Sequence, residues 1–163
     1  SLSDFARPAQ MLEAPQHIHR ENAGYTNIEG VKNTFLGYSA GYLNTASYNV
    51  FLGYNAGHFN TTGAYNTFLG HLAGYNNTIG YRNTIIGNEA GISNTEGYGN
   101  NFIGNYAGLT NTTGYYNTFQ GNSAGYYNTT GSQNAFFGTL AGRNNVQGHA
   151  NTLIGYGAGY SVE

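Results

Sequence analysis

Short apolar and polar segments alternate along this chain with a 17-residue period. The tetrapeptide Asn-Thr-Phe-Leu at 33–36 is followed by a glycine, and a closely similar stretch returns seven more times. The glycines after the apolar pair are Gly37, Gly53, Gly70, Gly87, Gly104, Gly121, Gly138 and Gly155. An Ala-Gly pair follows each of them at the same distance, as at 40–41. Self-similarity at a fixed short period is typical of a solenoid, in which each repeat is one stacked unit.

Each repeat is predicted to contain short strands rather than a helix. No apolar stripe with a 3.6-residue spacing is visible, and each glycine inside a helix would cost roughly 1 kcal/mol relative to alanine. Asn-Thr-Phe-Leu is typical of a strand that ends at a glycine corner, and Asn-Thr-Thr-Gly of a second short strand or a turn. We therefore predict an all-β protein, a parallel β-solenoid of about eight 17-residue coils that stack about 4.8 Å apart.

The repeats are expected to span residues 23–163, because Ala23-Gly24-Tyr25 matches part of one more copy. The first full copy is one residue short near Ala46-Ser47, and a turn can accommodate the deletion. Residues 1–22 form a separate lead-in or cap segment in this prediction, since the stretch 1–32 holds seven of the twelve charged residues and both prolines. The missing initiator Met and the C-terminus in mid-pattern suggest a piece of a longer protein.

Stacking converts each repeat position into a column, and two apolar columns are adjacent in the sequence. The Phe column is Phe35, Phe51, Phe68, Ile85, Phe102, Phe119, Phe136 and Leu153. The Leu column is Leu36, Leu52, Leu69, Ile86, Ile103, Gln120, Phe137 and Ile154. Neighbouring side chains of a strand point to opposite faces, so one column fills the coil interior with the alanines and the other faces outward. An outward apolar stripe of this length calls for partner chains to cover it; the alternative is a corner that turns both columns into one core.

Two columns of asparagine are as regular as the apolar ones. The first Asn ladder is Asn33, Asn49, Asn66, Asn83, Asn100, Asn117, Asn134 and Asn151. The second Asn ladder is Asn44, Asn60, Asn77, Asn94, Asn111, Asn128 and Asn145. Asparagine tolerates left-handed corners and bonds its own backbone, and stacked amides bond to the coils above and below. We expect a structural role for both ladders rather than direct ligand binding.

Composition narrows the classes of function. Charged residues make up 7% of the chain and the net charge is −2, so no basic surface is available for phosphates and nucleic-acid binding is not expected. Aromatic residues make up 15%, which opposes intrinsic disorder. Cysteine is absent, so the chain has neither disulfides nor thiolate metal sites. No run of about 18 apolar residues exists, so membrane insertion is not expected.

The repeat N-T-F-L-G-x-x-A-G-x-x-N-T-T-G resembles two groups of fibre proteins over about residues 23–160. It is similar to repeats in the heads of trimeric autotransporter adhesins, and more closely to 17-residue arrays of bacterial and phage tail-fibre-like proteins. The resemblance implies a left-handed parallel β-roll with three chains around one axis, and attachment of cells or phages to surfaces. A parallel homotrimer then has the Leu column as its interface, where Gln120 could bond its symmetry mates and set the register.

The same resemblance implies a location outside the cell, on a cell surface or on a virion-like or tail-like particle. Aromatic side chains at the variable positions are the candidate ligand-binding residues. They are Tyr38, Tyr54, His58, Tyr65, Tyr75 and Tyr126. Aromatic faces pack on the apolar faces of sugars, and repeated weak sites give avidity. We expect an adhesive function toward a cell-surface glycan or another envelope receptor, although the tyrosines could instead cover coil corners and seal neighbouring subunits.

His17-Ile18-His19 has the one metal-like spacing in the chain. In an extended segment His17 and His19 face the same way. In a trimer three such pairs would place six imidazoles around the axis, enough for an octahedral metal ion. No other cofactor is expected.

Two further functions are weaker alternatives. The threonine column Thr45, Thr61, Thr78, Thr95, Thr112 and Thr129 could order water, as in an ice-binding solenoid, but nearby Tyr and His would disturb a flat face. Glu89 and Glu96 lie in one repeat and could form the carboxylate pair of a polysaccharide-degrading spike. Nothing else converges on these two residues, so enzymatic activity is not expected.

Overall fold

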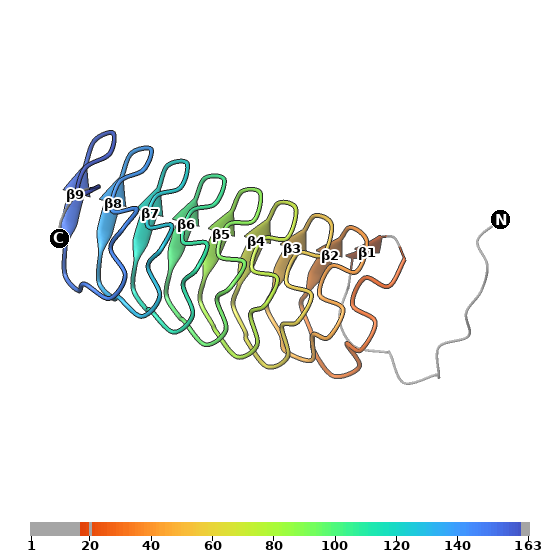
Figure 1. Ribbon diagram of the computed structural model, residues 1–163. Coiled ribbons are helices and arrows are strands. Elements are labelled where there is room, and N and C mark those ends of the chain that lie inside the picture. Colours follow the sequence, from red (N-terminus) through yellow and green to blue (C-terminus); the bar gives the residue numbers. More distant parts are fainter. Residues whose placement is uncertain (1–16, 20, 161–163) are drawn as a thin grey trace.

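A computed structural model describes residues 17–19 and 21–160 as one continuous parallel β-solenoid, as predicted (Figure 1). The strands are β1 (His17–His19), β2 (Thr34–Leu36), β3 (Val50–Leu52), β4 (Thr67–Leu69), β5 (Thr84–Ile86), β6 (Asn101–Ile103), β7 (Thr118–Gln120), β8 (Ala135–Phe137) and β9 (Thr152–Ile154). They form a single sheet in the order β1 to β9, with about seven 17-residue turns between β2 and β9. The described part of the chain contains no helix that is long and apolar enough to cross a membrane.

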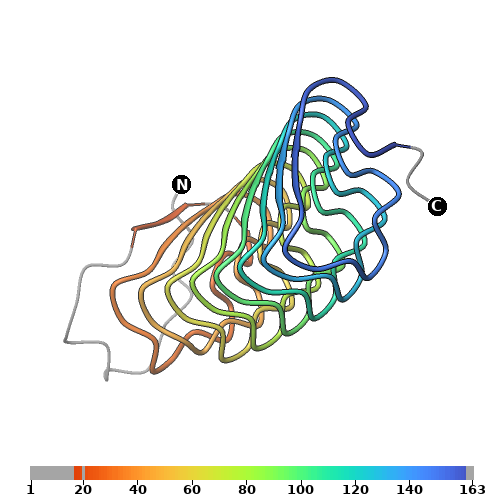
Figure 2. The ribbon, with the colours of Figure 1, turned by 90° about the vertical axis from the view of Figure 1, so that its left-hand side faces the viewer.

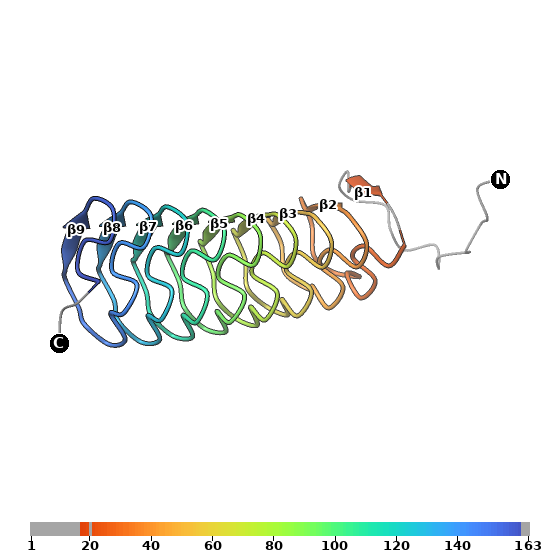
Figure 3. The ribbon, with the colours of Figure 1, turned by 45° about the horizontal axis from the view of Figure 1, so that its top comes forward.

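Successive coils follow nearly the same path, as the view toward the β9 end shows (Figure 2). The strands lie side by side along one face of the stack (Figure 3), and each pairs in register with the next. Phe35 is opposite Phe51, and Phe51 is opposite Phe68. Identical repeat positions therefore form columns along the axis, as the sequence predicts.

The one-residue deletion in the first full copy leaves this register intact. Thr34 still pairs with Val50, its counterpart in the next coil. The carbonyl of Ala46 accepts hydrogen bonds from the side-chain amides of Asn33 and Asn44, at 2.8 and 2.7 Å. The corresponding acceptor in the next coil is the carbonyl of a glycine, Gly63. The shortened turn thus absorbs the deletion, as expected.

The sheet begins before the first repeat that the sequence reveals. Strand β1 pairs with β2 in the same register as the later strands, with His17 opposite Thr34 and Ile18 opposite Phe35. The backbone at 17–19 thus continues the coil pattern into the segment that we assigned to the lead-in. Ile18 occupies the register position of the Phe column.

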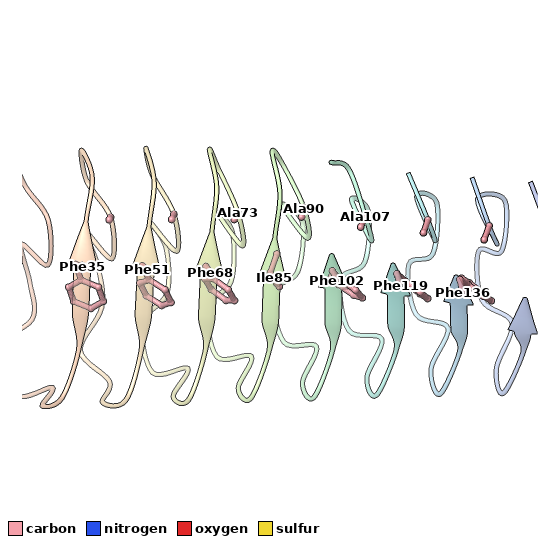
Figure 4. Packing of buried hydrophobic residues seen from close by; sticks show 14 of the residues in the cluster. Phe35, Phe51, Phe68, Ala73, Ile85, Ala90, Phe102, Ala107, Phe119 and Phe136 are labelled. Atoms are coloured by element: carbon pink, nitrogen blue, oxygen red, sulfur yellow. The ribbon is translucent and has the colours of Figure 1, made fainter. Parts of the chain in front are cut away.

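The Phe column and the alanines fill one part of the coil interior. Figure 4 shows the Phe side chains reaching from the strands toward the alanines of the opposite limb. The fully buried members are Phe35, Phe51, Phe68, Ile85, Phe102, Phe119 and Phe136. Neighbouring phenylalanine rings stack with centroids 4.8 to 5.2 Å apart. Full burial of one such side chain contributes about 1.5–3 kcal/mol.

The two Asn ladders fill a separate part of the interior. The Nδ2 atom of Asn60 donates to Asn44 Oδ1 at 2.7 Å and to the Gly63 carbonyl at 2.8 Å. Asn49 of the first ladder donates to that same carbonyl at 2.9 Å, and its Oδ1 accepts from the backbone of Asn66 at 2.8 Å. A Cβ on Gly63 would overlap the next coil's glycine carbonyl, so glycine is required at this point of a full-length turn, whereas the shortened turn has Ala46 there. The structural role expected for the asparagines is confirmed.

The left-handed corners lie one residue away from where the asparagines were expected to make them. Positive φ falls on the residue just before each buried alanine and each asparagine of the first ladder: Tyr65, with φ 60°, precedes Asn66, and Leu72, with φ 56°, precedes Ala73. The prediction of ladder asparagines at left-handed corners is therefore wrong. The corner residue turns the chain so that the following side chain enters the interior, at a cost of roughly 1–2 kcal/mol for a non-glycine residue. Asn-Thr-Thr-Gly forms bends rather than a second strand.

Candidate ligand-binding surface

The Leu column lies on the outer face of the sheet. The strand-centre residues of β2 to β8 are buried, whereas every member of the Leu column is half-buried or exposed. Leu36 and Leu69 are each 44% exposed, and Ile154 is 72% exposed. The alternative in which a corner turns both apolar columns into one core is thus wrong. A stripe of Leu, Ile and one Phe, interrupted by Gln120, follows the sheet from β2 to β9.

The outward aromatic side chains gather in stacks because the same repeat position recurs one coil apart. The Tyr42 stack is Tyr25, Tyr42, His58 and Tyr75, with ring centroids 5.0, 5.0 and 5.3 Å apart. The Tyr38 stack is Tyr38, Tyr54 and His71, at 5.4 and 5.5 Å. Tyr48 and Tyr65 form a stacked pair at 4.8 Å. Tyr81, Tyr98 and Tyr115 stack at 4.9 and 5.0 Å.

A shallow groove of about 390 Å³ adjoins the Tyr42 stack. It is lined by Leu43, Phe59, Thr61, Asn76, Thr78, Ser93 and Thr95. Phe59 belongs to both features, since its ring meets His58 and Tyr75 edge-on at 4.6 and 5.0 Å. The Thr61 hydroxyl donates to the Thr78 carbonyl at 3.0 Å, and the next threonines repeat this bond, so their hydroxyl protons are directed along the stack. The groove therefore combines an aromatic ring and apolar groups with a few polar atoms and no charge.

The Tyr38 stack changes its chemistry along the axis. Beyond His71 the same repeat position holds Asn88, Asn105 and Asn122. The Nδ1 atom of His71 lies 3.0 Å from Asn88 Oδ1, and the Asn88 backbone donates to Asn105 Oδ1 at 3.2 Å. One outer column is thus aromatic in the first coils and amide-rich in the middle ones.

Two groups in these stacks have displaced pKa values. Burial between two tyrosine rings lowers the pKa of His58 below its ordinary 6.5, and a backbone contact at Ser39 opposes the shift in part. Desolvation, and then the neighbouring phenols, raise the pKa of Tyr98 above 10.0. Both shifts favour the neutral form of the ring.

The six predicted ligand-binding residues do not converge on one site. His58 and Tyr75 share the Tyr42 stack, Tyr38 and Tyr54 share another, and Tyr65 stacks on Tyr48. Tyr126 lies apart from them. Its ring and those of Tyr127 and Tyr160 surround the Arg143 guanidinium at 5.3, 4.8 and 5.7 Å. Their role in binding stays a prediction.

Sequence reasoning missed several members of these surfaces. Tyr25 extends the Tyr42 stack into the partial first copy, and Phe59 lines the groove. Tyr98 is the centre of a stack at the position two residues before the first Asn ladder. A column-by-column alignment at that position contains the signal, since tyrosine recurs there in three successive copies.

The metal and carboxylate predictions concern other parts of the chain. The backbone of His17 and His19 belongs to β1, but their side chains lie outside what the structure describes, so the metal site stays a prediction. Among the described residues, no group of three or more His, Asp or Glu could hold a metal ion. Glu89 occupies a left-handed corner, and Glu96 lies in an exposed bend of the same repeat.

Comparison with known proteins gave no match. No family model, no curated protein and no solved structure is significantly similar to the chain. The coils and their columns define the chain as a parallel β-solenoid repeat protein with a 17-residue period.

Proposed function

We propose that this chain is the structural and adhesive part of a homotrimeric fibre on a cell surface or on a virion-like or tail-like particle. The observation that carries the proposal is the Leu column. The Phe column lies inside the coils of a single chain. The Leu column remains as an apolar stripe on the outside of the sheet from β2 to β9. Burial of apolar surface stabilises by about 25 cal/mol per Å², so partner chains that cover the stripe gain free energy in every coil.

The resemblance of the repeat to trimeric fibre arrays supports three parallel chains. In a parallel trimer each position of the stripe meets its own counterparts at one level of the axis. Gln120 then faces two other Gln120 side chains, which can satisfy its amide and fix the register. A rod with regular coils also suits a fibre, since each coil contacts only its neighbours and the length can vary.

The adhesive surface is the Tyr42 stack with the adjoining groove. Its aromatic rings, amide groups and lack of charge suit the apolar faces and hydroxyls of a neutral glycan. Three chains, each with such a surface, would bind with avidity even where one site is weak.

The solution mass tests the assembly. Light scattering should give three times the 17.5 kDa chain mass. Leu69→Lys, which places a charge on the stripe without touching the Phe column, should reduce that mass to a single chain with an unchanged circular dichroism spectrum. Thr113→Lys, at an exposed bend in the same solenoid, is the matched control and should keep the trimer. A wild-type protein with the mass of one chain would overturn the trimer.

A glycan array tests the adhesion separately. The wild-type chain should bind neutral glycans, and Phe59→Ala should lose that binding while keeping the assembly mass. Tyr156→Ala, an exposed tyrosine outside the described stacks, is the control that should still bind. Release of free sugar from a bound glycan would instead favour the polysaccharide-degrading alternative, and an array without signal would remove the glycan from the proposal.

A further inference from the structure

Four tyrosines form the densest group of phenols in the described chain. Tyr81, Tyr98 and Tyr115 stack in successive coils with ring planes only 1° and 2° apart. The ring of Tyr116 meets Tyr98 edge-on at 5.2 Å and Tyr115 edge-on at 5.7 Å. We call these four residues the Tyr98 cluster. Tyr98 contacts the three other rings.

A glycine one coil away makes room for the fourth ring. Gly99 lies in the same column as Tyr116 and has φ 63°. A Cβ on Gly99 would lie 2.6 Å from Cδ1 of Tyr116, so the Tyr116 ring covers a position that no other side chain could share. Because Gly99 has no side chain, the Tyr116 ring can pack edge-on against Tyr98 and Tyr115.

In this cluster the solvent-accessible phenol of Tyr116 contacts a pair of tyrosines, Tyr98 and Tyr115, whose relative geometry is fixed by the coils. Tyr116 is 56% exposed, whereas Tyr98 and Tyr115 are half-buried in the stack. An oxidant in solution can reach Tyr116, and its ring contacts both members of the pair. The coil spacing keeps Tyr98 and Tyr115 parallel and adjacent, and each is anchored by the coil that carries it.

We propose that the Tyr98 cluster is a site of oxidative cross-linking, at which Tyr98 and Tyr115 are joined as dityrosine. The oxidant is a peroxide, activated by a haem peroxidase. Each phenol loses one electron and one proton, and the hole formed on Tyr116 can pass to the stacked pair by hydrogen-atom exchange. The two phenoxyl radicals couple through the ring carbons ortho to oxygen, and each ring then returns its ortho hydrogen to its own oxygen. One hydrogen peroxide takes up the two hydrogen atoms and becomes two molecules of water.

The parallel pairs of tyrosine outside the Tyr98 cluster lack this arrangement. They are Tyr25–Tyr42, Tyr38–Tyr54 and Tyr48–Tyr65. No third tyrosine ring is in described contact with any of these pairs, so each depends on direct oxidation of both of its members. The Tyr98 cluster is therefore expected to react first.

The bond would connect two residues at the same repeat position of adjacent coils. A covalent link between coils closes a loop and restricts the unfolded chain, as a disulfide does. The chain contains no cysteine, so dityrosine would be a covalent staple available to this solenoid. This inference concerns one chain alone and holds whether or not the fibre proposal does.

The test treats the wild-type chain with hydrogen peroxide and horseradish peroxidase. Chymotrypsin cleaves after Phe102 and Leu109, so a Tyr98–Tyr115 link appears in mass spectrometry as two joined peptides with two hydrogens fewer than their sum. Dityrosine fluorescence should rise with the same time course. On a denaturing gel the product should still run as a single chain, since the link lies within one molecule.

Three variants separate the proposal from general oxidation. Tyr98→Phe keeps the ring stack but removes the phenol, and should abolish the joined peptides. Tyr116→Phe should slow their formation while leaving the pair intact. Tyr54→Phe, in another stack, should leave both yield and rate at the wild-type level. The proposal is wrong if Tyr116→Phe has no effect, or if the first links form at other tyrosines or between chains.

Discussion

The interior of the solenoid has two parts that follow different rules. The part filled by the Phe column accepts other apolar residues, as Ile85 and Leu153 show. The part filled by the Asn ladders accepts none, since all eight copies of the first ladder are asparagine. Apolar burial depends on volume and has no direction, whereas an amide must place its donors and its acceptor at fixed points. The apolar part makes the coil compact, and the amide part fixes how one coil sits on the next.

A substitution at Asn77 tests this difference between the two parts most directly. Its Nδ2 atom donates to Asn60 Oδ1 at 2.6 Å and to the Gly80 carbonyl at 2.9 Å, and its Oδ1 accepts from Asn94 at 2.8 Å. Asn77→Leu keeps a side chain of four heavy atoms branched at Cγ but removes all three bonds. Each of the three partners keeps another hydrogen bond, and a lost intramolecular hydrogen bond costs about 0.5–1.5 kcal/mol, so we expect a loss of roughly 3 kcal/mol in the free energy of unfolding.

Urea denaturation followed by circular dichroism measures this loss. Phe119→Leu is the matched change in the apolar part, and it should cost less than about 1.5 kcal/mol because the site keeps its apolar character. Asn76→Leu, at the half-exposed neighbouring position, controls for the new side chain and should stay within about 0.5 kcal/mol of wild type. Equal losses for Asn77→Leu and Phe119→Leu would contradict the distinction between the two parts.

A smaller effect is expected outside the core, at His58. Its pKa lies below 6.5 in the folded chain because burial between Tyr42 and Tyr75 disfavours the charged ring. The unfolded chain therefore binds the proton more readily as the pH falls through 6.5, and the folded state loses stability there. Above pH 6.5 both states hold a neutral ring, and the contribution is fully present.

His58→Tyr isolates this contribution, since tyrosine already occupies the same column on both sides. The unfolding free energies of both chains should be compared at about pH 7.5 and about pH 5. Wild type should weaken more than the variant at the lower pH. If the gap between the two chains is the same at both pH values, the buried imidazole does not contribute in this way.

The sequence predicted the regular features of the fold because they follow from the period alone. Residues at equal repeat positions had to stack, and Phe35 and Leu36 had to face opposite sides once a strand was assigned to them. Pairing of Tyr38 with Tyr54, and of His58 with Tyr75, follows from the same argument. Tyr126 and Arg143 also occupy the same repeat position in adjacent coils. Their contact was not predicted, because the period does not specify side-chain rotamers.

By itself, then, the sequence determined the strand positions, the membership of each column and the side of the strand on which each column lies. Only the tertiary structure decided which residues meet across the coil, such as Asn49 and Asn60 at the Gly63 carbonyl, and which residues form left-handed corners, such as Tyr65. The physical reason is that contacts along the axis are fixed by the repeat and the coil spacing. Contacts across a coil depend on the dihedral angles of every turn between the two residues, which a repeat length does not specify.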